Sequence, residues 1–415
     1  MRILIHGINY APERIGIGKY TAEMAGWLAT RGHEVRVVTA PPYYPEWRRG
    51  EGYSVFQYKR ELSADVRIWR CPLWVPRAPN GFKRIVHLLS FALSSFPVML
   101  RQVFWRPDVV LTIEPPLFCA PHAWLAARLS GAKAWLHVQD LETAAFFGLG
   151  FARSGFLRKC VTSAESLIMR AFDHVSSISN TMVERIHSLG VERGRTSLFP
   201  NWVDVQQIHP DVDGRALKNA WGLAGSLKII LYSGNIGKKQ GLELLIDSAA
   251  DVAAARPDAL FVIVGEGAAK ADLVCMVEDK KLSNIIFKPL QSIEKLPSLL
   301  SMADVHLVIQ KRGAADAVMP SKLTSILAAG GQAIITADEG TELGRLLREH
   351  PGIAVLVEPE NREALSLAIM QTLDQRGTDG AVNRVARTYA ETHLSTERVL
   401  RKFEDELIGL RTGRT

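Results

Sequence analysis

One stretch near the middle of the chain restricts the possible fold more than any other: Ile229–Gly241, which reads IILYSGNIGKKQG. Its apolar start is followed by a glycine-containing turn and then by the periodic apolar pattern of a helix over 242–254. This order predicts a buried strand, a tight turn and a helix start, the β–α unit of α/β proteins. Glycine lets the backbone approach a ligand, and a helix N-terminus presents free N–H groups to anions. We predict that this turn binds a diphosphate through Gly234, Asn235, Lys238 and Lys239; an ordinary β–α turn with solvated lysines is the alternative.

The same alternation of strand and helix patterns runs along the whole chain. Strands are predicted over 2–8, 34–39, 107–114, 134–138, 175–179, 229–232, 260–264, 285–287, 305–309, 332–335 and 354–357. A stretch that mixes proline, glycine and charged residues follows residue 204, as a linker would. Since 415 residues are enough for two domains, we predict an α/β fold with two Rossmann-like domains that face a cleft. The N-terminal domain is predicted over 1–205, joined by a C-terminal helix over 394–415, and the C-terminal domain over 206–393.

The composition excludes few classes of protein or ligand. The net charge is +7 and the pI is near 9.2, a mild basic bias that suits nucleotide phosphates, anionic lipid or nucleic acid alike. The four cysteines are scattered without a C-x-x-C pair, which favours reduced thiols in a cytoplasmic setting. Because Met1 leads directly into a predicted strand, we expect no signal peptide.

The most apolar segment is Ile85–Leu100, IVHLLSFALSSFPVML. It is shorter than the roughly 20 residues of a membrane span and contains a histidine, three serines and a proline, so we do not predict a transmembrane helix. Basic residues flank it: Lys83, Arg84, Arg101 and Arg106. This pattern suits a helix on an anionic membrane surface, and a buried helix with solvated ends is the alternative.

The first half carries two groups of candidate site residues. Gly16 and Gly18 lie at the start of the first predicted helix, 19–30, the usual anion position beside a parallel sheet. Their match to a dinucleotide fingerprint or a P-loop is poor, so we predict a loop that faces phosphate or sugar. His137 and Asp140 follow the strand over 134–138, at the end where ligands bind in open α/β sheets. We predict a catalytic role for both, although a structural role suits either one alone equally well.

The second half adds two strand-end turns. Gly265, Glu266 and Gly267 follow one predicted strand, and Glu266 is a candidate donor contact. The stretch Met319–Gly331 predicts a loop, a short helix with a lysine and hydroxyls in its first turn, and a glycine break. A helix N-terminus with an ammonium and hydroxyl donors can hold a phosphate and a neighbouring ribose. The candidate donor contacts here are Pro320, Ser321, Lys322, Thr324 and Ser325.

Several long runs resemble one known family. They are GINYAPERIGIGKYTAEM (7–24), RVVTAPPYYPEW (36–47), FPNW (199–202), ILYSGNIGKKQGLE (230–243) and QKRGAADAVMPSKLTSILAAGG (310–331). Over essentially its whole length the chain resembles the GT-B glycosyltransferases of the retaining family 4 group, and within it the WcaI-type colanic acid transferases, described as fucosyltransferases that use GDP-fucose. The resemblance implies a donor nucleotide held by the C-terminal domain, a C-terminal helix that crosses back to the N-terminal domain, and no obligatory metal or other cofactor.

The sequence departs from the family pattern at the diphosphate and ribose positions. Many members have Arg where this chain has Asn235 and Lys where it has Gln240. The family's ribose-binding Glu falls at Ser325, and the earlier Glu of the same pair falls near Ala317. We therefore expect Lys238, Lys239 or Lys322 to supply the positive charge.

The resemblance leads to one functional hypothesis and several alternatives. We expect transfer of L-fucose from GDP-fucose, with retained anomeric configuration, to a hydroxyl of a lipid-linked oligosaccharide in exopolysaccharide biosynthesis. The expected partners are the nucleotide sugar, this acceptor and an anionic membrane surface, with no nucleic acid, and the expected location is the inner face of the cell membrane. The alternatives are a UDP-sugar-dependent transferase, for example for N-acetylfucosamine, a sugar-nucleotide epimerase, and a non-catalytic protein that binds nucleotide sugars.

Overall fold

The computed structural model describes residues 1–13, 15–77, 81–140, 155–238, 240–313, 319–375 and 382–413. The chain divides into two compact units: unit 1 comprises Met1–Pro200 and Leu400–Thr415, and unit 2 comprises Asn201–Val399. The ranges expected from the sequence, 1–205 with 394–415 and 206–393, divide the chain at nearby positions. Each unit is an α/β layer structure, so the predicted fold class is confirmed.

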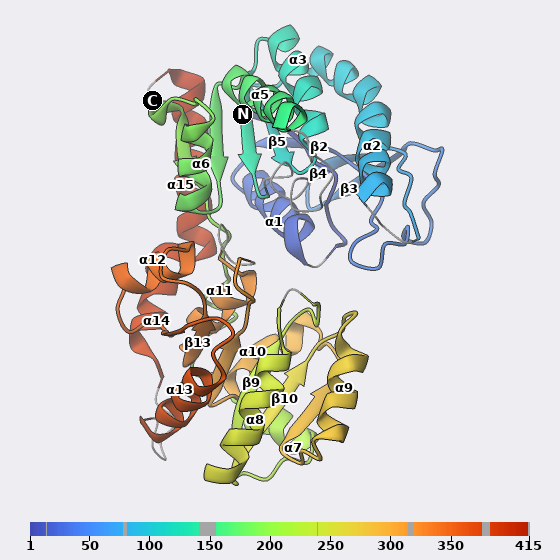
Figure 1. Ribbon diagram of the computed structural model, residues 1–415. Coiled ribbons are helices and arrows are strands. Elements are labelled where there is room, and N and C mark those ends of the chain that lie inside the picture. Colours follow the sequence, from blue (N-terminus) through green and yellow to red (C-terminus); the bar gives the residue numbers. More distant parts are fainter. Residues whose placement is uncertain are drawn as a thin grey trace. The chain divides into compact units, whose positions relative to one another are not determined.

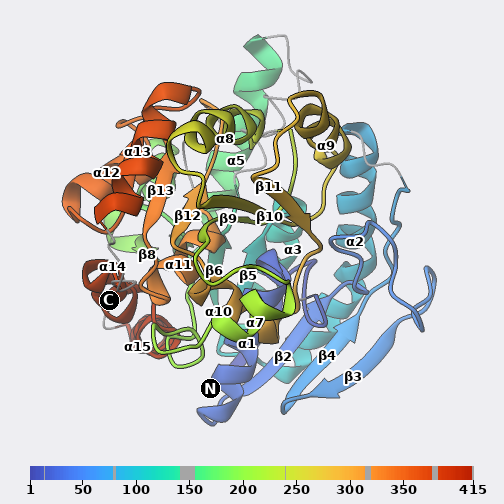
Figure 2. The same cartoon turned by 90° about the horizontal axis from the view of Figure 1, so that it is seen from below.

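Unit 1 is built on a sheet of eight strands among the described residues, in the order β3-β4-β2-β1-β5-β6-β7-β8. Its strands are β1 (Arg2–His6), β2 (Glu34–Thr39), β3 (Lys59–Ser63), β4 (Val66–Arg70), β5 (Val109–Glu114), β6 (Lys133–Val138), β7 (His174–Ser177) and β8 (Thr196–Leu198). The pairings are parallel except for that of β3 with β4. Its helices are α1 (Gly16–Thr30), α2 (Gly81–Gln102), α3 (Ala120–Ser130), α5 (Gly155–Ala171) and α6 (Asn180–Ser188). Figures 1 and 2 show α2, α3 and α5 on one face of this sheet and α1 on the other.

Unit 2 is built on a parallel sheet of six strands in its described part, in the order β11-β10-β9-β12-β13-β14. The strands are β9 (Lys228–Ser233), β10 (Ala259–Val264), β11 (Ile285–Lys288), β12 (Val305–Val308), β13 (Ala333–Thr336) and β14 (Val355–Val357). Its helices are α7 (Arg215–Ala220), α8 (Glu243–Ala255), α9 (Lys270–Asp279), α10 (Leu296–Ser301), α11 (Ser321–Ala328), α12 (Glu342–Glu349), α13 (Arg362–Gln375) and α14 (Arg384–Tyr389).

The alternation of buried side chains along β9 explains how unit 2 forms its two layers. Ile230 and Tyr232 pack into a core cluster with α8, α9 and α13, whereas Ile229 and Leu231 pack into a second cluster with α7 and α10. Successive residues of a strand point to opposite faces, so an uninterrupted apolar run requires helices on both faces. Figure 2 shows these helices on the two sides of the β9–β13 strands.

The last helix, α15 (Thr396–Thr412), ends in unit 1. Phe403 lies parallel to Phe199 at 4.2 Å between ring centroids, and its ring is 5.1 Å from that of Trp135. Glu404 is buried and accepts from Arg31 Nε at 3.2 Å, and its second oxygen lies 2.8 Å from His33 Nε2. The C-terminal residues are therefore part of the unit 1 core, as the family resemblance implied.

Candidate functional site

Two strand-end turns of unit 2 interlock through their backbones. Gly234 N donates to Val264 O at 2.9 Å, Ile236 N donates to Glu266 O at 2.9 Å, and Ala269 N donates to Ile236 O at 3.0 Å. The turn after β9 and the turn after β10 are thereby fixed side by side. Both lie at the carboxyl ends of neighbouring parallel strands, where ligands bind in open α/β sheets.

The glycines of these turns allow this close approach. A Cβ on Gly265 would lie 1.9 Å from Gly234 O, and a Cβ on Gly267 would lie 2.2 Å from Ile236 O. Their φ angles of +156° and +159° are also ones that other residues rarely adopt. The spacing Gly265-Glu266-Gly267 is thus required by backbone packing, a reason that the sequence pattern alone did not supply.

Lys322 is the central charged residue of this region. It occupies the first turn of α11, whose N-cap residue, Pro320, gives no side-chain cap. Its Nζ lies 4.0 Å from the centre of the Tyr232 ring and 3.4 Å from the position of a Cβ on Gly234. Among the described residues, no carboxylate pairs with this ammonium group, and burial lowers the pKa of Lys322 to about 7. An ammonium without a counter-ion at a helix N-terminus beside a glycine turn is arranged to receive an anion.

Neighbouring side chains support this geometry. Tyr232 is fully buried, and its hydroxyl donates to Asn235 O at 2.8 Å, which holds the turn under the ammonium. Gln240 Oε1 accepts from Gly237 N at 3.1 Å and so closes the same turn. The Gln240 side chain therefore stabilises the turn.

The other predicted donor residues lie around Lys322 with different environments. Ser321, Asn235 and Lys238 are exposed, and Pro320 and Ser325 are half-buried. The Glu266 carboxylate pairs with Lys270 Nζ at 2.8 Å, and Thr324 is buried with its hydroxyl donating to Ser321 O at 2.7 Å. Lys239 lies outside the described residues.

In unit 1, the end of β1 holds a buried carboxylate that the sequence reasoning missed. Glu13 Oε1 accepts the backbone N–H groups of Tyr43 at 2.9 Å and Tyr44 at 3.0 Å, and Oε2 accepts from Asn9 Nδ2 at 2.9 Å. Burial raises the pKa of Glu13, and these hydrogen bonds oppose that shift. Glu13 thus joins the loop after β1 to the loop after β2. No local pattern marks it, because its backbone donors, Tyr43 and Tyr44, lie about 30 residues away in sequence.

Gly16 and Gly18 both lie in the first turn of α1, which starts three residues earlier than predicted. Gly16 has a φ of +62°. Gly18 is buried against Glu13, and a Cβ there would lie 2.6 Å from Glu13 Oε2. Gly18 therefore provides room for the Glu13 carboxylate, which is a packing role.

The two predicted catalytic residues differ in environment. His137 is 2% exposed; its Nδ1 lies 2.9 Å from Ser176 Oγ and its Nε2 lies 3.1 Å from Gln139 Nε2. Burial lowers the pKa of His137 to about 3, so the ring is neutral near pH 7. Asp140 is exposed just after β6. The contacts of His137 are thus those of a residue that positions the end of β6. Asp140 is accessible at the surface.

No group of three or more His, Cys, Asp or Glu side chains that could hold a metal ion occurs in the part of the chain that the structure describes. The candidate site consists of the glycine turns after β9 and β10, the N-terminus of α11 and Lys322.

Two family models match the chain in succession. Residues 16–202 match the glycosyl transferase 4-like domain, and residues 213–390 match the glycosyl transferases group 1 domain. A relative from Escherichia coli (strain K12), named as colanic acid biosynthesis glycosyl transferase WcaI, is 51% identical over 414 residues, which cover 99% of this chain and 100% of the relative. The N-acetyl-alpha-D-glucosaminyl L-malate synthase of Bacillus anthracis is 21% identical and covers 96% of this chain and 95% of its own.

Solved structures with the same fold cover nearly the whole chain. The sucrose-phosphate synthase of Thermosynechococcus elongatus has a TM-score of 0.75 at 17% identity and covers 100% of both chains. WaaG, a glycosyltransferase involved in lipopolysaccharide biosynthesis, has a TM-score of 0.67 at 16% identity and covers 98% of this chain and 100% of its own. At these identities the likeness concerns the fold.

Proposed function

Because this chain belongs to the GT-B glycosyltransferases, we propose that it transfers a sugar from a nucleotide diphosphate donor that is anchored in unit 2. The observation that carries this proposal is the ammonium group of Lys322. It lies beside the Gly234 turn and over the Tyr232 ring, without a carboxylate partner among the described residues. A diphosphate is the anion that a glycosyltransferase donor brings to such a place.

In the proposed mechanism, the leaving diphosphate is stabilised by Lys322 and the N–H groups of the first turn of α11. Preorganised hydrogen-bond donors of this kind stabilise the negative charge that develops on the diphosphate as its bond to the anomeric carbon of the sugar breaks. The acceptor hydroxyl attacks the anomeric carbon from the face that the diphosphate leaves, so the anomeric configuration is retained. The proton of this hydroxyl passes to an oxygen of the departing diphosphate. Asp140 orients the reacting sugar, and His137 holds the end of β6 through Ser176 and Gln139.

We propose GDP-fucose as the donor and a lipid-linked oligosaccharide as the acceptor, in a colanic-acid-like biosynthesis and without a metal or other cofactor. The support is the relation to the E. coli protein named for colanic acid biosynthesis. A thermal-shift panel of GDP- and UDP-sugars tests the donor, since a ligand that binds the folded state raises the melting temperature. The expected result is a shift with GDP-fucose that exceeds the shift with UDP-N-acetylfucosamine; the reverse order identifies the UDP-sugar alternative.

Turnover tests the role of Lys322. We expect Lys322→Ala to lower kcat/KM for transfer by about 100-fold or more, in line with the removal of a transition-state charge contact. Lys295→Ala, which changes an exposed lysine of unit 2, is the matched control. Near-normal transfer by Lys322→Ala contradicts the assignment. An isomerised donor in the absence of acceptor identifies an epimerase, and binding without any turnover on isolated acceptors identifies a binding protein.

We also propose that α2 contacts an anionic membrane surface on the cytoplasmic side. The segment Gly81–Trp105 is apolar and long enough to cross a membrane by length and composition, a test that core helices of soluble proteins also pass. Leu93 is 72% exposed and Phe104 is 88% exposed, with Arg101 and Arg106 close in sequence. Apolar side chains with basic neighbours suit the interface of an anionic bilayer.

Sedimentation with vesicles tests this contact. We expect the wild-type chain to bind vesicles that contain phosphatidylglycerol and Leu93→Ser/Phe104→Ser to bind them several-fold more weakly. Leu129→Ser/Leu167→Ser, which changes two other exposed leucines of unit 1, is the control. Equal binding by all three proteins contradicts the proposal.

A further inference from the structure

A cavity of about 790 Å³ lies at the β3 edge of the unit 1 sheet. Its walls come from β2, β3, β4 and the second half of α2. Four of the residues that line it are arginines, Arg36, Arg60, Arg67 and Arg101, against one acidic residue, Glu61. None of them belongs to the strand-end turns described above, and among them only Arg101 enters the proposed function, as a basic neighbour of the membrane contact.

The strand register brings three of these arginines to one face of the sheet. Arg36 of β2 is paired with Arg67 of β4, near the amino ends of both strands. Arg60 of β3 is opposite Trp69, which lies two residues after Arg67 and on the same face. Arg101 reaches the same cavity from α2. Four positive side chains from four elements thus converge in one hollow.

Arg36 is held rigidly at the base of this group. Its guanidinium lies 4.0 Å from the centre of the Trp105 ring and 5.3 Å from that of Trp69. Its Nη1 donates to Gln102 Oε1 at 3.0 Å, and its buried Nε has no hydrogen-bond partner in the described part of the chain. Burial lowers the pKa of Arg36, although the side chain stays charged near neutral pH. A guanidinium fixed by two indole rings and an amide loses little freedom when it binds an anion.

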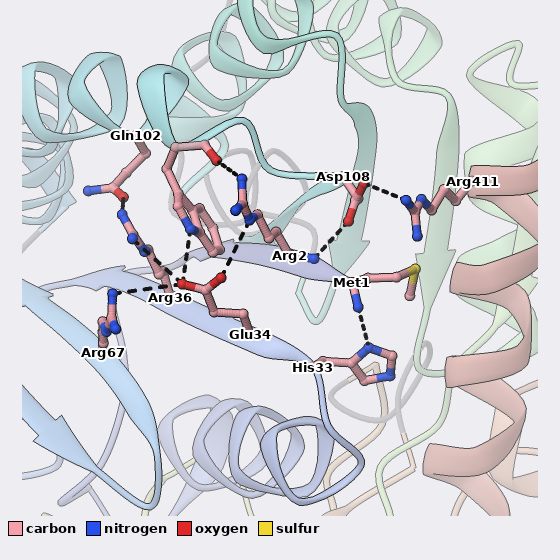
Figure 3. A network of polar contacts seen from close by, with 10 residues as sticks. Met1, Arg2, His33, Glu34, Arg36, Arg67, Gln102, Asp108 and Arg411 are labelled. Carbon is pink, nitrogen blue, oxygen red and sulfur yellow. Dashed lines mark hydrogen bonds and ion pairs between the residues drawn. The ribbon is translucent and has the colours of Figure 1, made fainter.

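The acidic residues nearby do not balance these charges. Figure 3 shows the Glu34 carboxylate shared among arginines: it is 3.4 Å from Arg2, 3.7 Å from Arg36 and 3.7 Å from Arg67. It also accepts from Trp105 Nε1 at 3.1 Å. One carboxylate can neutralise only one of these three cations.

The positive charges of Arg60 and Arg101 are balanced even less by carboxylates. Glu61 already accepts from Tyr53 at 2.8 Å and from Arg70 at 3.0 Å. Arg60 and Arg101 are exposed and make no ion pair with any described residue. The hollow therefore carries an excess of positive charge that its own chain leaves unmatched.

We propose that this cavity is a second anion site, which binds a phosphate-bearing group that is separate from the sugar donor in unit 2. Guanidinium groups match phosphate oxygens in pairs, and arginine is the residue that proteins use most for this recognition. The volume suits a ligand larger than a single phosphate. The rings of Trp69 and Tyr58 in its lining provide apolar surface for the organic part of such a ligand.

Calorimetric titration with inorganic pyrophosphate at constant ionic strength tests this site. The titration is done in a Lys322→Ala background, so that the proposed donor site does not contribute. We expect Arg60→Gln/Arg101→Gln to weaken binding by at least about tenfold, since each lost contact is a hydrogen bond to a charged group. Both side chains are exposed and unpaired, so the fold should be retained, and circular dichroism checks this.

The matched control is Arg170→Gln/Arg185→Gln. It removes two exposed arginines from α5 and α6, which connect the strands near the opposite, β8 edge of the same sheet, and leaves the cavity intact. We expect this variant to bind pyrophosphate as the background protein does. Equal binding by the cavity variant and the control, whether both are weakened or neither is, overturns the proposal.

Vesicle sedimentation then separates the two sources of the phosphate group. If Arg60→Gln alone, which leaves Arg101 of the proposed membrane contact in place, weakens binding both to pyrophosphate and to phosphatidylglycerol-containing vesicles, unlike the control, the site takes a phosphate borne by a lipid. If it loses pyrophosphate binding and still binds these vesicles like the control, the site takes a soluble phosphate compound. If it retains both, the cavity is not a phosphate site.

Discussion

Replacement of Lys322 by methionine should stabilise the ligand-free protein. The ammonium of Lys322 is enclosed without a carboxylate partner in the described part of the chain, and its pKa falls from 10.5 to about 7. A shift of this size corresponds to an upper limit of about 5 kcal/mol of destabilisation of the folded state at or below about pH 7. In the wild-type protein, the contact of the ammonium with the Tyr232 ring offsets on the order of 1 kcal/mol of this destabilisation. Because methionine fills similar space without charge, we expect Lys322→Met to raise the free energy of unfolding of unit 2 by about 1–3 kcal/mol at about pH 7.

The pH dependence of this difference follows from the direction of the shift. Since the pKa in the folded state lies below that in the unfolded state, the unfolded state binds more protons between about pH 7 and 10.5. The stability of the wild-type protein should therefore rise through this interval relative to Lys322→Met. The advantage of the variant should be largest at about pH 7 and below, and it should shrink toward about pH 10.5.

Thermal or urea unfolding of the full chain, followed at several pH values, measures the effect. For a unit of about 200 residues, 1 kcal/mol changes the melting temperature by about 2–4 °C. Lys295→Met, at an exposed site in unit 2, should leave the transition unchanged. If Lys322→Met melts at a lower temperature than the wild-type protein, or if its advantage does not vary with pH, the ammonium is not destabilised by burial. The same variant should lose donor binding, so that stability and function change in opposite directions.

The remaining predictions concern packing and buried groups. Gly18→Ala should destabilise unit 1 by about 1–3 kcal/mol in urea unfolding, because the new Cβ meets Glu13; Gly26→Ala, in the same helix with open space around it, should be neutral or stabilise by up to about 1 kcal/mol. Glu13→Ala should cost about 2–4 kcal/mol in the same assay, because it leaves buried N–H groups unpaired. Gly265→Ala should abolish any thermal shift by nucleotide sugars, because its Cβ would collide with Gly234 O; a retained shift contradicts the interlocked turns. Burial lowers the pKa values of His122 and four other histidines of unit 1 below the ordinary 6.5, so the unfolded state binds more protons below that pH, and the urea midpoint of unit 1 should fall as the pH is lowered from about 6.5 to 4; a constant midpoint contradicts this. The other four are His6 (pKa about 3), His87 (about 4), His137 (about 3) and His174 (about 4).

The central strands of both sheets could be predicted closely from the sequence. Val305–Ile309 was predicted where β12 spans Val305–Val308, and the expected strand over 34–39 matches β2. Both strands are largely buried, so apolar residues dominate them and the pattern is readable from the sequence. The hairpin of β3 and β4 was missed because KRELS and VRIWR carry many charges at the edge of a sheet. Their apolar alternation is weak there.

Residues of the candidate site could be predicted only where neighbouring residues in the sequence form a recognisable turn or helix pattern. Gly234 and Lys322 lie in segments whose turn and helix patterns are readable, and the structure brings them within contact distance. The role of Glu13 depends on a loop about 30 residues away, and the burial of His137 depends on Ser176 and Phe199. The arginine-lined cavity likewise depends on strand register and on α2. Contacts that are distant in sequence leave no periodic pattern, so single-sequence reasoning cannot reveal them.

The position of Phe403 and Glu404 affects the order in which the protein can mature. Synthesis on the ribosome proceeds from the N-terminus, and domains commonly fold as they emerge. Here the stacking partner of Phe199 and the acceptor for His33 are made only after the whole of unit 2, and the acceptor follows His33 by 371 residues. Part of the interior of unit 1 therefore stays uncovered until the residues after unit 2 have been made, and a chain terminated within unit 2 should be recognised by chaperones or proteases through its N-terminal half.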